Sequence, residues 1–119
     1  MARIELTRRA ILDIADIEQY SLKEWGPRVA DEYLVDLSAA LERLGESPQL
    51  LRERPEIFPR LRFYRVRKHF LVGDVIGDRI LVLTVVHGSM DLPKRLAELE
   101  PLLLEEVELL HRRIAREEP

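Results

Sequence analysis

Three short apolar runs between Arg60 and Asp91 constrain the fold of this chain more than any other feature. They extend from Leu61 to Val66, from His69 to Ile76 and from Ile80 to Val86. The last two are separated by Gly77-Asp78, and a glycine there tolerates the positive φ of a tight hairpin turn. The runs predict a three-stranded antiparallel meander. Its last run is rich in β-branched residues, and we expect it to be the central strand of the sheet.

The sixty residues before the meander predict one strand and two helices. Residues 2–7 alternate apolar and polar side chains, as a half-buried strand does. Apolar residues then recur at helical spacing from Ile11 to Trp25 and again from Ala30 to Leu44, with Gly26-Pro27 between them. Such a short connection predicts an antiparallel helix hairpin. Residues 48–60 contain three prolines and predict a loop, from which Ile57 and Phe58 reach the core.

The residues after Asp91 predict a further helix. Leu96, Leu99, Leu103, Val107, Leu110 and Ile114 follow one another at steps of three and four. Pro101 lies within this pattern and predicts a break or kink near Glu100, followed by a helix of about four turns. The apolar stripe has two interpretations, because it can pack on its own domain or serve as a self-association or partner surface.

The size and composition indicate a single soluble domain. The chain has 119 residues, of which 46% are hydrophobic and 34% charged, and this is ordinary for one globular domain. No apolar stretch approaches the roughly 18 residues that a membrane span needs, and the N-terminus lacks a signal pattern. We therefore expect a cytoplasmic protein with no membrane partner. The chain contains no cysteine, which excludes disulfides and thiolate chemistry.

The charges concentrate on the predicted meander. Residues 51–80 hold eight basic and four acidic side chains, although the whole chain carries a net charge of −3. A basic surface of this kind attracts nucleic acid and acidic protein segments alike. It can also be a solvated face that keeps the protein soluble.

The sequence offers no recognisable metal or cofactor site. Its three histidines are scattered, and no pair of potential ligands has the spacing of a zinc or two-metal site. No glycine-rich phosphate loop is present. We predict that the protein uses no cofactor and no metal.

An ordered set of residues carries a resemblance to a known family. The set comprises Leu6-Thr7 with Ala10, residues 14–20, Trp25-Gly26-Pro27, Ala30 with Tyr33, residues 37–44, Ser47-Pro48, residues 59–62, His69, and Val85-Val86-His87 with Met90-Asp91. In this order the chain resembles the ParE/RelE toxin superfamily of bacterial type II toxin–antitoxin systems. The resemblance covers roughly residues 3–95 and is closer to the ParE branch.

The resemblance implies an α+β fold. It comprises an N-terminal strand, an antiparallel helix hairpin, a three-stranded antiparallel meander that joins the first strand in one sheet, and a long C-terminal helix. Residues 1–95 would form the toxin domain, and residues 96–119 a helical extension of the same domain.

The ParE branch implies a toxin that binds and poisons DNA gyrase and is not itself an enzyme. Its implied partner is a ParD-like antitoxin whose disordered tail folds on the toxin surface. We expect partner-binding residues on the basic meander and at the end of its last strand: Arg60, Arg62, Arg65, Arg67, Lys68, Met90 and Asp91. The C-terminal helix is a candidate site for homo- or hetero-oligomer formation. A family member without toxicity, serving only as a binding module, remains an alternative.

A second alternative is a metal-free endoribonuclease of the RelE type. Such an enzyme needs an acid, a base and cations around the phosphate. The candidate catalytic residues are Arg62, Arg65, Arg79 and His87, although the three arginines can equally be solvent-facing strand residues. In the family, a tyrosine often lies four residues after the histidine that opens the strand. In this chain that position holds Gly73, which is followed by Asp74. This departure favours the gyrase interpretation.

Overall fold

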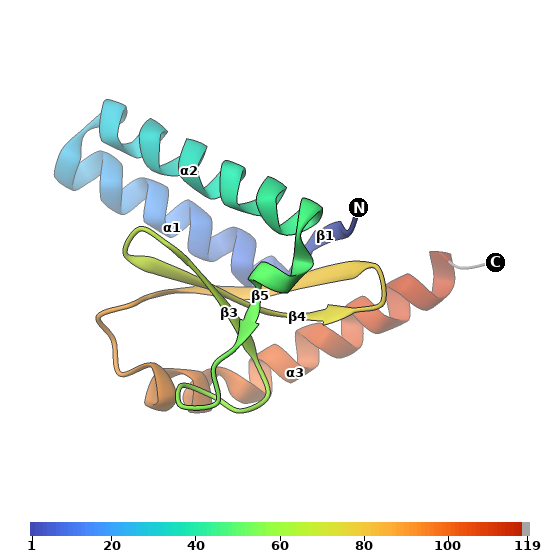
Figure 1. Ribbon diagram of the computed structural model, residues 1–119. Coiled ribbons are helices and arrows are strands. Elements are labelled where there is room, and N and C mark those ends of the chain that lie inside the picture. The colour runs from blue at the N-terminus through green and yellow to red at the C-terminus, as the bar shows by residue number, and fades with distance from the viewer. Residues whose placement is uncertain (118–119) are drawn as a thin grey trace.

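The computed structural model describes residues 1–117 as one five-stranded sheet with helices on both faces (Figure 1). Its elements are β1 (Arg3–Leu6), α1 (Arg8–Trp25), α2 (Pro27–Glu46), the short 3₁₀ helix η1 (Pro48–Leu50), β2 (Arg52–Glu53), β3 (Arg62–Val66), β4 (His69–Ile76), β5 (Arg79–His87) and α3 (Leu92–Glu117). The predicted α+β architecture is confirmed.

The sheet has the strand order β1-β5-β4-β3-β2. β5 pairs in parallel with β1 and antiparallel with β4, so it lies inside the sheet, as predicted. It is not the middle strand, because the segment predicted as a loop contains β2, which pairs with β3 and adds a fifth strand. Two residues are too short a strand to leave a periodic signal in the sequence.

The helix hairpin begins with a side-chain cap. Thr7 Oγ1 accepts a hydrogen bond from the Ala10 amide at 3.0 Å and donates one to the Leu83 carbonyl at 2.8 Å. One threonine thus caps α1 and fixes its start to β5. Gly26, at φ +90°, ends α1, and Pro27 begins α2, where its missing amide hydrogen costs nothing.

Two apolar layers hold the sheet between its helices. The layer under the hairpin includes Leu37, Leu44 and Leu71, and the layer under α3 includes Phe63, Leu83 and Leu96. Ile57 and Phe58 pack against the second layer, as predicted. Because both faces of β5 are covered, all its residues from Arg79 to Val86 are buried.

Of the break or kink predicted near Glu100, the break does not occur, because α3 continues through Pro101. Proline inside a helix typically costs about 3 kcal/mol. Leu96, Leu99 and Leu103 are all buried against the sheet on both sides of this position. A fully buried leucine contributes roughly 1.5–3 kcal/mol, so packing outweighs the defect. None of the helices within residues 1–117 combines the length and apolarity that a membrane crossing requires.

Candidate functional site

A cleft of about 440 Å³ opens between the helix hairpin and the β3–β4 turn. We call it the hairpin cleft. It is lined by Asp16, Ile17, Tyr20, Ser21, Trp25, Val29, Tyr33, Arg67, Lys68, His69 and His87. Tyr20 and Trp25 are 63% and 65% exposed, so the mouth of the cleft presents aromatic side chains to solvent. Exposed aromatic groups beside cations are typical of partner-binding surfaces.

Two histidines and a tyrosine form a connected group in this cleft. His69 on β4 lies opposite His87 on β5, with ring centroids 4.9 Å apart. The Tyr33 hydroxyl of α2 forms a short hydrogen bond with His69 Nδ1. Burial, and to a smaller degree the neighbouring His87, lowers the pKa of His69 to about 4, while burial raises the pKa of Tyr33. Both side chains are therefore neutral at pH 7. The hydrogen-bond partner of His69 is thus a side chain rather than a backbone group.

The low pKa of His69 predicts a loss of stability in mild acid. An unfolded histidine takes up its proton near pH 6.5, whereas folded His69 resists protonation until about pH 4. The stability that neutral His69 contributes to the folded state is therefore fully present above pH 6.5 and is lost as the pH falls towards 4. We expect the free energy of unfolding to fall by about 1–2 kcal/mol over this range, because the ring is partly exposed and screened by solvent. Urea unfolding at several pH values measures this effect. A His69→Gln variant should show a shallower dependence in this range, and an identical dependence would contradict the assignment.

Three of the candidate partner-binding arginines are already paired with carboxylates, two of them with groups on the sheet and α3 and the third, Arg67, with Asp36 of α2. Arg60 Nη2 lies 2.8 Å from Glu100 Oε1 of α3. Arg62 forms ion pairs with Glu53 at 3.4 Å and Asp74 at 3.6 Å. These carboxylates reduce the positive potential that the sequence predicts along β3.

Two cations beside the β3–β4 turn are not neutralised by carboxylates. Within residues 1–117, neither Arg65 nor Lys68 has a carboxylate within 4.0 Å. Arg65 lies over the Phe70 ring, 5.4 Å from its centroid, and donates to the Arg67 carbonyl at 2.8 Å. Arg67 has a positive φ of 53° and pairs with Asp36 of α2. These contacts connect the turn to α2 beside the hairpin cleft.

The two remaining partner-binding candidates follow β5. Met90 is 48% exposed and lines a hollow next to the cleft, together with Arg9 and His87. Asp91 Oδ1 accepts a hydrogen bond from the Lys94 amide at 3.3 Å, in the first turn of α3. Asp91 therefore acts as a helix cap, whereas the Met90 side chain is available to a partner.

The four catalytic candidates do not converge. Arg79 and His87 stand at opposite ends of β5, about 27 Å apart at the usual rise per residue. Arg79 is only 7% exposed and pairs with Glu5 and Glu117, so neither the catalytic interpretation nor the solvent-facing alternative describes its surroundings. Arg62 lies opposite Gly73, and Arg65 opposite Phe70. Only Arg65 lies at the same end of the sheet as His87.

His87 has its own local partner. Its Nδ1 accepts hydrogen bonds from the Ser89 amide at 3.1 Å and from Ser89 Oγ at 2.7 Å. Within residues 1–117, no three His, Cys, Asp or Glu side chains gather closely enough to bind a metal ion.

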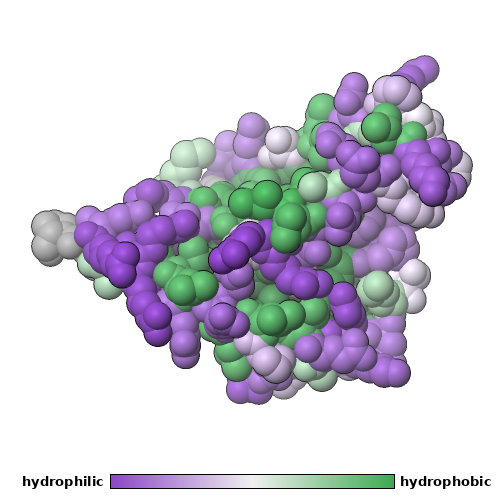
Figure 2. Space-filling view, turned by 180° about the vertical axis from the view of Figure 1, so that it is seen from behind, coloured by the Kyte–Doolittle hydropathy of each residue, from purple (hydrophilic) through white to green (hydrophobic). Residues whose placement is uncertain are grey.

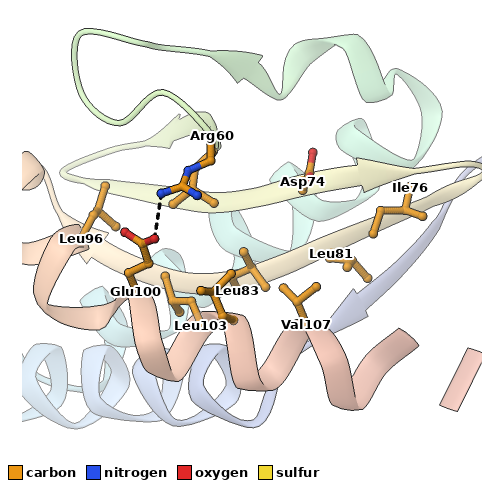
Figure 3. Close-up of a pocket in the computed structure, with 11 residues that line it drawn as sticks. Arg60, Asp74, Ile76, Leu81, Leu83, Leu96, Glu100, Leu103 and Val107 are labelled. Carbon is orange, nitrogen blue, oxygen red and sulfur yellow. Dashed lines mark hydrogen bonds and ion pairs between the residues drawn. The ribbon is translucent and has the colours of Figure 1, made fainter. Parts of the chain in front are cut away.

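A second, smaller cavity of about 140 Å³ lies between α3 and the sheet. Figure 3 shows Leu96 and Leu103 of α3 facing it, together with Leu81 and Leu83 of β5. The Arg60–Glu100 ion pair crosses its rim. Its lining is mostly aliphatic, with Arg60, Asp74 and Glu100 as the charged members, so it offers space for an aliphatic group.

The contact of Tyr33 with His69 is a feature of the candidate site that the sequence does not reveal. Its place in the helical repeat of α2 indicates a core residue, and its match to the family pattern assigns it no partner. The pairing with His69 depends on how α2 packs over β4, and no spacing in the sequence encodes that distance. The free charge of Lys68, by contrast, belongs to the basic segment that the sequence does identify.

Comparison with known proteins now identifies the family. The family model described as "ParE toxin of type II toxin-antitoxin system, parDE" matches residues 4–92. The chain belongs to the ParE toxin family. It is 32% identical to Toxin ParE of Escherichia coli over 94 residues, which cover 78% of this chain and 91% of that protein. It is 31% identical to Toxin ParE1 of Caulobacter vibrioides over 91 residues, covering 76% and 94% of the two chains.

A solved structure supports the ParE fold independently. The chain superposes on a chain of a chromosomal ParDE system from P. aeruginosa with a TM-score of 0.64 and 21% identity, over 73% of this chain and 96% of that one. The match to the ParE family ends at Leu92, the first residue of α3. The extension predicted over residues 96–119 therefore follows the matched segment, and its last two residues lie outside the described part of the chain.

Proposed function

We propose that this ParE-family toxin acts by binding and poisoning DNA gyrase in the bacterial cytoplasm, without a cofactor and without catalysis of its own. The observation that carries the proposal is the match of the ParE toxin family to residues 4–92, which include the whole hairpin and nearly the whole sheet. Inhibition by binding requires only a surface. The exposed aromatic groups of the hairpin cleft, with Arg65 and Lys68 beside them, supply one.

We further propose that a ParD-like antitoxin neutralises the toxin. Relatives named ParE toxins and a structural neighbour from a ParDE system support this partner. An antitoxin tail that carries carboxylates and apolar side chains would complement the hairpin cleft in both charge and polarity. Folding of such a tail on the toxin surface would bury the exposed rings of Tyr20 and Trp25.

The ribonuclease alternative receives less support from the geometry. A metal-free nuclease needs its acid, base and phosphate-binding cations within a few ångströms of one phosphate. The candidates Arg62 and Arg79 both lie away from the end of the sheet that carries His87. The pairing of Arg62 with Glu53 and Asp74 further reduces its attraction for phosphate.

Brief induction of the chain in a bacterial host carrying an SOS-response reporter tests the proposal. We expect growth arrest together with a strong SOS response, because a poisoned gyrase leaves broken DNA. The variants Arg62→Ala and His87→Ala should remain toxic if they fold. Growth should recover when a small antitoxin encoded beside the toxin is co-expressed.

Two other outcomes would refute the gyrase proposal. Arrest without an SOS response, abolished by His87→Ala in a folded protein, would favour the ribonuclease. A folded protein that causes neither arrest nor SOS response, in hosts that include its natural one, would indicate a family member that acts only as a binding module.

A further inference from the structure

The cavity of about 140 Å³ between α3 and the sheet is large for the interior of a small protein. Interiors are normally packed so closely that few spaces exceed the size of a water molecule. We call this space the α3 cavity. Most of its lining residues are leucine, isoleucine or valine: Leu61, Ile76, Leu81, Leu83, Leu96, Leu103, Leu104 and Val107. An apolar cavity of about 150 Å³ excludes water and is large enough to hold a benzene molecule.

The inner walls of the α3 cavity are fully removed from solvent. Leu81 and Leu96 are 0% exposed, and Leu83 is 1% exposed. Figure 3 shows Leu81 and Leu83 between the Arg60–Glu100 ion pair on one side and Ile76 on the other. A molecule in this space would therefore lose its contact with water and gain contacts with α3 and β5 together.

The other apolar hollow beside α3 lacks this enclosure. It is a groove between α1 and α3, where Figure 2 shows apolar side chains with charged groups among them. Its leucines, Leu12, Leu102 and Leu109, are 58%, 49% and 42% exposed. A small molecule in the α1–α3 groove would stay in contact with water. The α3 cavity is therefore the better site for an apolar ligand, because the hydrophobic gain follows the area removed from water.

The charged groups in the lining of the α3 cavity already have partners of opposite sign. Arg60 Nη2 lies 2.8 Å from Glu100 Oε1, and Asp74 Oδ1 lies 3.6 Å from Arg62 Nε. An ionised ligand would bring a charge into the cavity that none of these pairs balances, and burial of such a charge is costly. The lining therefore suits an uncharged ligand.

The position of the Arg60–Glu100 ion pair favours a free molecule over the side chain of a protein partner. The pair crosses the rim of the cavity. Its side chains are 72% and 31% exposed, and an ion pair at the surface is weak enough to open. The pair can close again behind a free molecule. A partner's side chain stays attached to its own backbone, which would keep the pair apart.

We propose that the α3 cavity binds a free, uncharged hydrocarbon molecule of about the size of a benzene ring, behind the Arg60–Glu100 ion pair. Bound ligand would stabilise the folded protein and the attachment of α3 to the sheet. The α3 wall of the site, with Leu96, Leu103 and Val107, follows Leu92, where the match to the ParE family ends. The site is therefore independent of the proposed action on gyrase.

A titration with benzene, followed by NMR of leucine and valine methyl groups, tests the proposal. Cell-free synthesis of the labelled chain avoids its toxicity during expression. We expect the methyl signals of Leu81, Leu83 and Leu96 to shift, with half-saturation at about 1 mM or below. Those of Leu37 and Leu44, in the layer under the hairpin, should not shift. Benzoate and benzylammonium carry the same ring with a charge and should bind at least about tenfold more weakly.

Two variants test the place of the ligand and the role of the ion pair. Val107→Phe puts a ring into the cavity and should abolish benzene binding. Val35→Phe is the matched control, because Val35 is 65% exposed on α2 and should leave binding unchanged. Glu100→Ala removes the carboxylate that holds Arg60 across the rim, and should weaken binding about threefold through faster release. Circular dichroism shows whether each variant folds.

Every outcome of these measurements bears on the proposal. An unmodified chain whose cavity methyl groups do not shift in benzene-saturated water would overturn it, whatever the folding of the variants. Shifts confined to Leu12, Leu102 and Leu109 would place the ligand in the α1–α3 groove instead. Equal binding of the charged rings would overturn the uncharged class. Unchanged affinity and release in a folded Glu100→Ala variant would overturn the choice of a free molecule over a partner's side chain.

Discussion

Replacement of Gly73 by alanine is expected to destabilise the protein by more than about 3 kcal/mol, the largest effect that we predict for a single methyl group. A Cβ added to Gly73 would lie 1.9 Å from the carbonyl oxygen of Leu81 and 3.0 Å from its carbonyl carbon. Both are backbone atoms of the neighbouring strand. A side chain could rotate away, but this backbone must move, and overpacking of this severity exceeds the usual 1–3 kcal/mol.

The sheet around Gly73 has little freedom to relieve the clash. The β4–β5 register shifts between Val72 and Gly73, where β5 carries an extra residue. On its other side, β5 is held by β1 through the pairs Glu5 with Leu81 and Leu6 with Val82. Moving Leu81 therefore disturbs two ladders and both apolar layers at once.

Urea unfolding followed by circular dichroism measures the effect of Gly73→Ala. Gly45→Ala is the matched control, because a Cβ at Gly45 would meet the Ala2 carbonyl oxygen at 3.4 Å, the edge of ordinary contact. Alanine is also the better helix former by about 1 kcal/mol, so this control should be neutral or slightly stabilising. Equal unfolding midpoints for both variants would show that the strand backbone adapts and that the close approach has no energetic weight.

The same bulge explains a feature that the sequence shows but cannot interpret. Gly73 occupies the place where the resemblance leads us to expect a tyrosine, and the structure leaves no room there for any side chain. Its neighbour Asp74 accepts a hydrogen bond from the Val75 amide at 2.8 Å and pairs with Arg62. The replacement of the expected tyrosine by Gly73 is therefore required by the close approach of the two strand backbones, and it also changes the chemistry of this position.

The bulge also sets the limit of prediction at the candidate site. The turn pairs Ile76 with Arg79, and an uninterrupted ladder from there would place His69 opposite Val86. The extra residue in β5 places His69 opposite His87 instead. Hydrophobic periodicity predicts strands but does not locate a bulge within a fully buried run. The histidine pair therefore could not be predicted, although the strand that begins at His69 is predicted.

Elsewhere the success of prediction follows the length of the periodic pattern. The helices α1 and α2 each extend over about five turns with clear boundaries, and the sequence predicts both. The sequence does not predict β2, because a strand of two residues shows no periodic pattern. The break at Pro101 is predicted from a local rule that tertiary packing overrides.

Removal of the Arg79 side chain is the second large effect on stability that we expect. Residue type alone makes Arg79 a catalytic candidate and so misassigns its role. Arg79→Ala should lower the free energy of unfolding by about 2–4 kcal/mol, because removing one member of a buried ion pair leaves the other charge uncompensated. The guanidinium lies 3.2 Å from carboxylate oxygens of both Glu5 and Glu117. Arg113 Nη2 remains bonded to Glu5 at 2.8 Å, which keeps the expected loss below the upper end of typical values.

The variant should lose toxicity in proportion to its unfolded fraction, and this loss must not be taken as evidence of catalysis. Arg65→Ala provides the contrast, because Arg65 is exposed and should leave the stability within about 0.5 kcal/mol of the unmodified protein. If Arg79→Ala unfolds at the same urea concentration as the unmodified protein yet abolishes toxicity, Arg79 acts on a target. The ion-pair network with Glu5 and Glu117 would then contribute little to the attachment of α3 to the sheet.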